Sequence, residues 1–501
     1  MRIGGLATGM DIDQLVGKLM KAERMPLDRM EQDRTILTWK RDAYRTINKA
    51  LLELENMTLK MELGSTYNTK SVSSTQENAV TATGTPTASN GVYNIEVTQL
   101  AKSAINVGGV IGSNIDQSAT LESQFGTGVP TGDFEFYTYK EDGTKDTHTF
   151  SVSADDTLND VLGRITEADN NVRAFFDPQS QKVVLETTRT GDYNKSTEFA
   201  GAEIGFNSTA NSFFTDTLKL TADGTQAGQA GQDAAFTYNG QLGLTSKDNN
   251  YTLNGINFEF KNTTVGSAKL TVNNNVEASF ESVMKFVDKY NQLVEELNKT
   301  QQDEIYRDYK PLTDEQKEAM SEDEAELWEE KAKSGILRNE SIISNGMYAM
   351  RRDWYANVAT GGDITSLTQI GITTSSDYRD GGKLVVNEAE LKKALTENPE
   401  GVQKLFSNDT EDASKGIVNR LEDSIESIMG RIEDRAGKGT DTLENYTLGK
   451  RMKDLDSQIM DFESRLARVE NRYWSEFTAM EKAIQRMNQQ SAQLMSQFGG
   501  A

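Results

Sequence analysis

The stretch from 448 to 498, LGKRMKDLDSQIMDFESRLARVENRYWSEFTAMEKAIQRMNQQSAQLMSQF, carries the strongest periodic pattern in the chain. Its apolar residues alternate between steps of four and three, which is the a/d spacing of a coiled-coil heptad repeat. One stutter, in which two steps of four meet at Tyr473, locally unwinds such a supercoil. The residues that we expect to make contacts along this helix are Leu455, Ile459, Phe462, Leu466, Val469, Tyr473, Phe477, Met480, Ile484, Met487 and Leu494.

A continuous helix over this stretch would be roughly 75 Å long. A single small domain cannot cover a rod of that length, so its apolar stripe should pack against another helix or another subunit. The alternative is one long core helix in a bundle, which the polar residues between the heptad positions disfavour. After Lys482 most polar positions are uncharged, and Arg486 is the last ionised side chain. Such a composition suits a surface that packs among several copies.

The N-terminal segment from 11 to about 62 also predicts helix, in two parts. Asp11 is placed to cap the first part, and Pro26 is expected to interrupt the helix because proline removes a backbone donor. The second part repeats apolar residues at steps of seven in an imperfect seam. The residues predicted to make contacts on these helices are Ile12, Leu15, Leu19, Leu27, Met30 and Leu37.

The middle of the chain, from about 66 to 273, is rich in Thr, Ser, Asn and Gly and predicts strands and turns. Asp142-Gly143 and Asn254-Gly255 are expected to turn two hairpins. Helix returns near 276, with a short strand island around 364–387. The chain therefore predicts an α+β multidomain fold, in which the N- and C-terminal helices form a coiled-coil leg and a helical bundle and β-rich head domains are inserted in the middle.

This organisation divides the chain into four predicted domains. They are a terminal coiled-coil leg of 1–45 plus 455–501, a mainly helical bundle domain with a small β element of 46–77 plus 274–454, a β-rich head domain of 78–104 plus 201–273, and a second, inserted β-rich head domain of 105–200.

Composition excludes several classes of chemistry. The chain has no cysteine and one histidine, His148, which removes thiol catalysis, Cys-based zinc sites and His-based metal clusters. The pair Asp155-Asp156 is better explained as a helix cap than as a glycosidase dyad. We therefore expect no enzyme activity, no catalytic residue, no metal and no cofactor. The formal charge of −24 disfavours nucleic acid as a partner. Because no stretch approaches the ~20 apolar residues of a membrane span, we also expect no membrane insertion.

Several separate motifs resemble the flagellar filament cap family, also called hook-associated protein 2, and they occur in the family's order. They are GGLATGMDIDQLVGKLMKAERMPLDRM at 4–30, GVYNIEVTQLAKSA at 91–104, SADDTLNDVLGRI at 153–165, LVVNEAELKKALTENPEGVQKLF at 384–406 and FTAMEKAIQRMNQQSAQL at 477–494. The acidic insertion around 300–335 has no role in this resemblance.

The resemblance implies a secreted, extracellular protein at the flagellum tip, exported unfolded by the flagellar type III apparatus. Copies would form a homo-oligomeric ring with mobile terminal helices as legs that grip the filament end. The ring would retain exported flagellin and promote its folding and polymerisation. Its partners would be further copies of itself, flagellin and an export chaperone, with a host surface added where a cap also acts as an adhesin.

Other functions stay open at this point. Another flagellar axial protein, such as a hook–filament junction protein, would share the helical ends and the β middle. A surface adhesin would act through the β head, and a secreted hydrolase on a helical stalk is a further class. The number of copies in a ring does not follow from the sequence, because heptads determine local pairing and not ring size.

Overall fold

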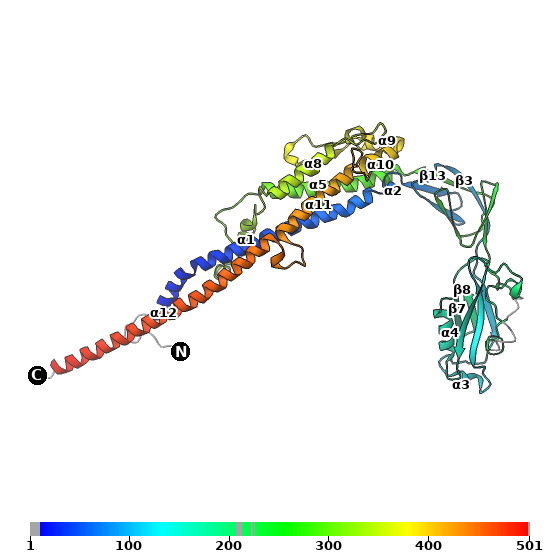
Figure 1. Cartoon of the computed structure of the whole chain (residues 1–501), viewed down its shortest axis with the longest axis horizontal. Coiled ribbons are helices and arrows are strands. Elements are labelled where there is room, and N and C mark those ends of the chain that lie inside the picture. Colours follow the sequence, from blue (N-terminus) through cyan, green and yellow to red (C-terminus); the bar gives the residue numbers. More distant parts are fainter. Residues whose placement is uncertain (1–10, 207–212, 222–223, 225, 499–501) are drawn as a thin grey trace. The chain divides into compact units, whose positions relative to one another are not determined.

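The computed structural model describes residues 11–498 apart from 207–212, 222–223 and 225, and the chain divides into two units (Figure 1). The helical unit joins Met1–Tyr67 to Val276–Ala501, and the β-rich unit comprises Asn68–Asn275. Helices at both ends of the chain and strands in the middle confirm the predicted α+β class.

The helical unit contains long helices together with short elements. They are α1 (Ile12–Met61), α2 (Gly64–Tyr67), α5 (Val276–Gln302), α6 (Asp314–Glu318), α7 (Glu322–Lys333), α8 (Ser341–Tyr355), β14 (Ile372–Thr374), β15 (Leu384–Val386), α9 (Glu388–Glu397), α10 (Pro399–Phe406), α11 (Ile417–Ala436) and α12 (Thr447–Phe498). The antiparallel pair β14–β15 confirms the predicted strand island.

Four helices enclose the core of this unit. Both α1 and α8 pack against α5 and against α11, so α1 and α8 occupy diagonal corners of the four-helix arrangement. The core contains fully buried aromatic side chains such as Tyr44, Phe286 and Tyr290, and the rings of Tyr290 and Trp354 lie 5.0 Å apart. Apolar residues at helical spacing on these four helices supply much of the rest of this core, and α9, α10 and α12 add others such as Leu391, Phe406 and Met452.

Helix α1 is continuous through Pro26, so the predicted interruption was wrong. Proline leaves the carbonyl of Ala22 without its backbone donor. Both residues are exposed, which lets water satisfy that carbonyl. The neighbouring Leu27 is buried and keeps the helix packed. Packing along the rest of α1 therefore outweighs the local cost of the proline. Asp11 caps α1 as predicted, because its carboxylate accepts a hydrogen bond from the backbone N–H of Gln14 at 2.9 Å.

The first part of the β-rich unit consists of two facing groups of strands. A five-stranded sheet has the order β1-β13-β3-β9-β10, and a three-stranded sheet has the order β11-β12-β2. Their bounds are β1 (Lys70–Ser74), β2 (Val80–Gly84), β3 (Gly91–Gln99), β9 (Ala234–Tyr238), β10 (Leu242–Ser246), β11 (Asn250–Leu253), β12 (Ile256–Phe260) and β13 (Ala268–Asn274). Alternating inward residues such as Ile95, Phe236 and Phe258 form one apolar core.

The second part of this unit has its own apolar core. Its elements are β4 (Ile105–Val110), α3 (Leu121–Phe125), β5 (Gly132–Tyr139), β6 (Lys145–Val152), α4 (Leu158–Glu167), β7 (Val172–Asp177) and β8 (Lys182–Thr187). Strands β4-β8-β7 form one sheet, and β5 pairs with β6. Phe206, Phe213, Phe214 and Leu220 belong to this core, although the sequence division placed them in the other head domain. The packing therefore favours a boundary beyond 200.

Local signals of the β-rich unit are mostly as predicted. β5 and β6 form a hairpin around Asp142-Gly143, and β11 and β12 form one around Asn254-Gly255. Asn254 has a φ of 49° and Gly255 a φ of 74°, as a primed turn requires. The N-cap of α4 was expected at Asp155 or Asp156, and this prediction was wrong by one or two residues. Thr157 forms the capping box with Asp160, and Asp156 instead forms an ion pair with Arg164.

Candidate interaction surface of the terminal helices

Helices α1 and α12 form an antiparallel pair, which is visible in Figure 1 as the blue and red helices. Three contacts give its register. The Tyr473 hydroxyl donates to Glu23 at 2.9 Å, and Arg34 Nε donates to Asp456 at 3.0 Å. The Thr38 hydroxyl lies 3.6 Å from the sulfur of Met452. Residue numbers rise along α1 as they fall along α12, so the first residues of α1 lie at the same end of the pair as the last residues of α12.

The structure divides the predicted contact residues of α1 into two groups. Ile12 and Leu27 are buried, and Met30 and Leu37 are half-buried. Leu15 and Leu19 remain 40% and 37% exposed. Four of these side chains are therefore covered at least in part within the chain, and the described part of the chain leaves Leu15 and Leu19 largely uncovered.

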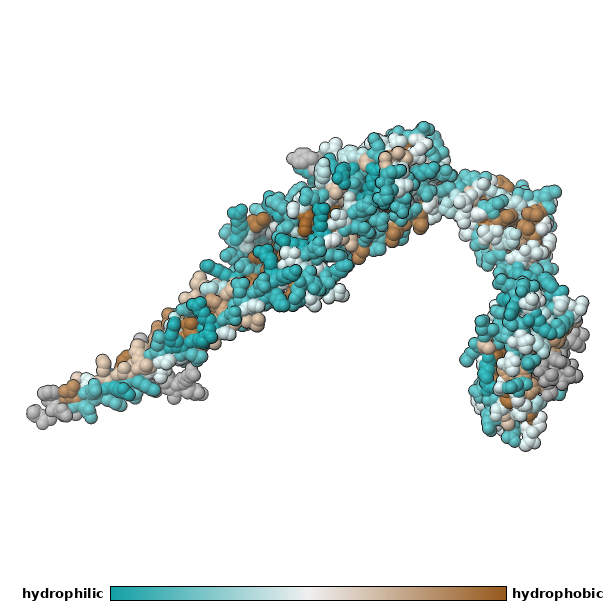
Figure 2. Space-filling model, in the orientation of Figure 1, coloured by the Kyte–Doolittle hydropathy of each residue, from teal (hydrophilic) through white to brown (hydrophobic). Residues whose placement is uncertain are grey.

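The predicted residues of α12 show decreasing burial toward its C-terminal end. Leu466 is buried, and Met487 and Leu494 are exposed. The intermediate group is half-buried and consists of Leu455, Ile459, Phe462, Val469, Tyr473, Phe477, Met480 and Ile484. Figure 2 shows hydrophobic residues distributed along this helix. The contact residues predicted from the heptad repeat do not include Met460 and Met495. Both are also exposed, and both lie outside the a/d positions.

The pair does not fully enclose the seam of α12. Most of its predicted contact residues stay half-buried, and Met487 and Leu494 are exposed. The distal part of α12 also offers few charges that would oppose close packing, since Arg486 is its last ionised residue. The pair therefore presents an apolar stripe that can bind further helices.

The acidic insertion, residues 303–335, packs against α1. The Gln32 side chain donates to the carbonyl of Pro311 at 3.0 Å, and Lys333 lies 4.8 Å from the ring centre of Trp39. Leu312 is buried. Within the insertion, the ring centres of Tyr309 and Trp328 are 4.5 Å apart. Sequence reasoning missed this role, and the available signal was a few aromatic and aliphatic residues in a mostly polar segment.

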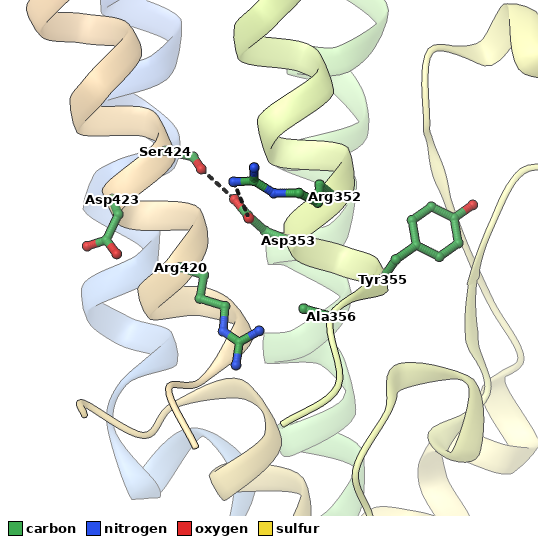
Figure 3. Close-up of a pocket in the computed structure, with 7 residues that line it drawn as sticks. All are labelled: Arg352, Asp353, Tyr355, Ala356, Arg420, Asp423 and Ser424. Atoms are coloured by element: carbon green, nitrogen blue, oxygen red, sulfur yellow. Dashed lines mark hydrogen bonds and ion pairs between the residues drawn. The ribbon is translucent and has the colours of Figure 1, made fainter. Parts of the chain in front are cut away.

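A depression of about 500 Å³ lies between α8 and α11 (Figure 3). Asp353 is buried there and accepts a hydrogen bond from the Ser424 hydroxyl at 2.5 Å, and burial raises the pKa of its carboxyl. The Arg420 guanidinium is held by backbone carbonyls, among them that of Lys415 at 2.9 Å. These contacts join the two helices.

Two kinds of site are absent from the described residues. Within 11–498, apart from its three gaps, no group of three or more His, Asp or Glu side chains is arranged to hold a metal ion. Over the same residues, no helix is both long enough and apolar enough to cross a membrane.

Long terminal helices, a helical bundle and an inserted β-rich unit make this a multidomain α+β protein. Known proteins with matching sequences identify its family. The family model for the flagellar hook-associated protein 2 C-terminus matches residues 231–489, and the model for its N-terminus matches residues 8–104. The chain belongs to the flagellar hook-associated protein 2 family.

Individual relatives cover nearly the whole chain. Flagellar hook-associated protein 2 of Halalkalibacterium halodurans is 36% identical, over 99% of this chain and 100% of the relative. A-type flagellar hook-associated protein 2 of Pseudomonas aeruginosa is 27% identical, over 99% and 98%. The crystal structure of domains D1-D2-D3 of the flagellar cap protein FliD from Escherichia coli has a TM-score of 0.56 at 19% identity, and covers 83% of this chain and 99% of that chain. This last likeness supports the fold alone.

Proposed function

We propose that this protein is the structural cap at the distal tip of the bacterial flagellar filament. Copies form an oligomeric ring that retains exported flagellin and promotes its folding and polymerisation. The terminal helices grip the filament end. The observation that carries this proposal is the apolar stripe of α1 and α12, which is half-buried within one chain and exposed at Leu15, Leu19, Met487 and Leu494.

The contacts along the helix pair are individually weak, which suits a grip that must be released as each flagellin inserts. The ion pair between Arg34 and Asp456 is more than one-third exposed on both sides, and such pairs contribute at most about 1 kcal/mol. Half-buried apolar residues each contribute a fraction of the ~2 kcal/mol of a fully buried one. The helices are thus held by many modest contacts.

The proposal also specifies where the protein acts and which partners it binds. The protein is secreted and acts outside the cell, and it binds further copies of itself and flagellin. An export chaperone covers the apolar stripe before assembly, because an exposed stripe of this length promotes aggregation. The relatives named above are flagellar hook-associated proteins 2. They therefore favour the cap over a hook–filament junction protein or a surface adhesin, and over an enzyme.

The four-domain division is also part of the proposal. Its leg, bundle and two head domains are supported by the three separate apolar cores and by the helix pair that extends beyond the bundle core. We place the end of the second head domain at about 220 instead of 200, because Leu218 and Leu220 lie in its core.

The test uses two exposed residues of α12 and a matched control. Met487→Asp with Leu494→Asp should leave the monomer folded, because both side chains are exposed, and should abolish filament growth in cells that lack the native cap. Flagellin should then accumulate in the medium. The control is Leu327→Asp in the insertion, since Leu327 is 61% exposed and Leu494 is 54% exposed. Normal filaments in the double variant would refute the proposed grip.

A further inference from the structure

The outer face of the bundle at α1 and α11 carries an acidic and apolar patch, consisting of Leu52, Leu59, Leu63, Glu55, Glu422 and Glu426. Leu52, Leu59 and Leu63 are all exposed, and Leu59 is 54% exposed. On α1, steps of three and four place Leu52, Glu55 and Leu59 on one side of the helix. This side does not face the core, which α1 contacts through Leu51 and Leu54.

Charge on this acidic patch is uncompensated. Burial and the neighbouring carboxylates of Glu62, Glu426 and Glu55 raise the pKa of Glu422 to about 7. The charged groups that contribute most to this shift are all acidic. Among the residues that the structure describes, Glu55, Glu422 and Glu426 form no ion pair with a Lys or Arg. The patch thus combines exposed leucines with carboxylates that lack a cation, and a basic, apolar surface would complement both.

The same chain carries such a surface on α8. This basic patch consists of Tyr348, Arg351, Arg352 and Tyr355. Tyr348 is 70% exposed, and the Arg352 side chain is 67% exposed. The Arg351 guanidinium lies 5.9 Å from the ring centre of Tyr355. Figure 3 shows Arg352 beside the depression, and Tyr355 projecting away from it.

The two patches also match in spacing and in position. Leu52 and Leu59 are seven residues apart on α1, and Tyr348 and Tyr355 are seven apart on α8, which is about 10 Å along either helix. Because α1 and α8 occupy diagonal corners of the bundle, their outer faces point to different sides of one molecule. One copy therefore cannot bring its own two patches together, whereas a row of copies can. Arg352 already pairs with the buried Asp353 at 3.6 Å, yet its side chain stays 67% exposed.

From this geometry we infer a head-to-tail interface between neighbouring copies, in which the acidic patch of one copy binds the basic patch of the next. The tyrosines pack against the leucines, and the arginines pair with the glutamates. An interface between two different patches generates a ring when the rotation closes. The inference rests on the proposed function, which requires a ring, and it specifies the bundle surfaces that build it.

Cysteine cross-linking tests this interface cleanly, because the full-length chain contains no cysteine. Leu59→Cys and Tyr348→Cys are each made in the full chain, and both positions are exposed. Under mild oxidation, a mixture of the two variants should give a covalent dimer, and each variant alone should stay monomeric. The chain that carries both substitutions should give a ladder that ends at the ring. Leu327→Cys mixed with Tyr348→Cys is the control and should not cross-link.

A second readout does not depend on disulfide geometry. Leu59→Lys should reduce assembly in sedimentation experiments at least tenfold, and Leu327→Lys should leave it unchanged. Cross-linking of Leu59→Cys with itself would mean a two-fold interface and overturn the inference. A wild-type chain that assembles, with no cross-link in the mixture and no effect of Leu59→Lys, would overturn this interface and leave the cap function standing. A wild-type chain that stays monomeric at every concentration would overturn both.

Discussion

Replacing Glu422 by Gln should stabilise the helical unit above neutral pH. Burial, followed by Glu62, raises the pKa of Glu422 from 4.5 to about 7. A carboxyl with a raised pKa binds its proton more tightly in the folded chain than in the unfolded chain. The free energy of unfolding therefore falls as the pH rises from about 4.5 to about 7, and it stays lowered above that range. Glutamine carries no charge and removes this penalty.

The size of the effect follows from the shift. A change of this size corresponds to at most about 3 kcal/mol, at 1.36 kcal/mol for each pH unit. Glu422 is only partly buried and shares its charge with Glu62, and solvent screens part of the repulsion. We therefore expect Glu422→Gln to raise the free energy of unfolding by about 1 kcal/mol at pH 8, and to change it little at pH 5.

Denaturation of the full chain followed by tryptophan fluorescence measures this effect in one unit, because every tryptophan lies in the helical unit. They are Trp39, Trp328, Trp354 and Trp474. The experiment uses dilute protein, so that assembly does not contribute. Glu318→Gln, at an exposed position of α6 outside the acidic patch, is the control and should change nothing at either pH. Equal stability of Glu422→Gln and the wild type at pH 8, or a loss there, would refute the reasoning.

Two further substitutions test the leg and the insertion. Pro26→Ala restores a backbone donor in an exposed part of α1 and should stabilise the helical unit by about 1–3 kcal/mol; an unchanged fluorescence midpoint would mean that the proline costs nothing where it stands. Trp328→Ala removes a half-buried ring that packs on Tyr309 and donates to the Lys310 carbonyl at 2.8 Å. It should cost about 2 kcal/mol locally and increase cleavage within 303–335 about thirtyfold in limited proteolysis. Cleavage no faster than in Leu327→Ala would contradict the packing role.

The parts of the fold that could be predicted from the sequence are those with local periodicity. Helix α12 repeats apolar residues over about seven heptads, and the hairpin at Asn254-Gly255 depends on two adjacent residues. The interruption at Pro26 was a local inference as well, and it failed because packing along α1 outweighs a local cost of about 3 kcal/mol. The sequence pattern of one segment does not show how strongly packing against neighbouring segments stabilises it.

The features that escaped prediction depend on contacts between distant segments. The hydrogen bond from Gln32 to Pro311 spans 279 residues, and the acidic patch joins Glu55 on α1 to Glu422 on α11. No periodic signal in either segment indicates such a pair. The partial exposure of Leu15 and Leu19 could not be predicted either. A heptad position indicates which face of the helix a residue occupies, and it does not indicate whether a partner covers that face.

A single heptad repeat thus acquires two different roles along α12. Leu448 and Met452 are fully buried in the bundle core, whereas Met487 and Leu494 at the other end of the same repeat are exposed. The proximal end is therefore anchored as firmly as any core helix. At the distal end, covering the exposed part of each leucine or methionine contributes about 1 kcal/mol. A few such contacts hold a neighbour for a time, and thermal motion can still release it. A fully buried zipper of the same length could not exchange partners in this way, so, for the proposed cap, partial burial of the distal stripe is the property that would let the terminal helices both bind and release.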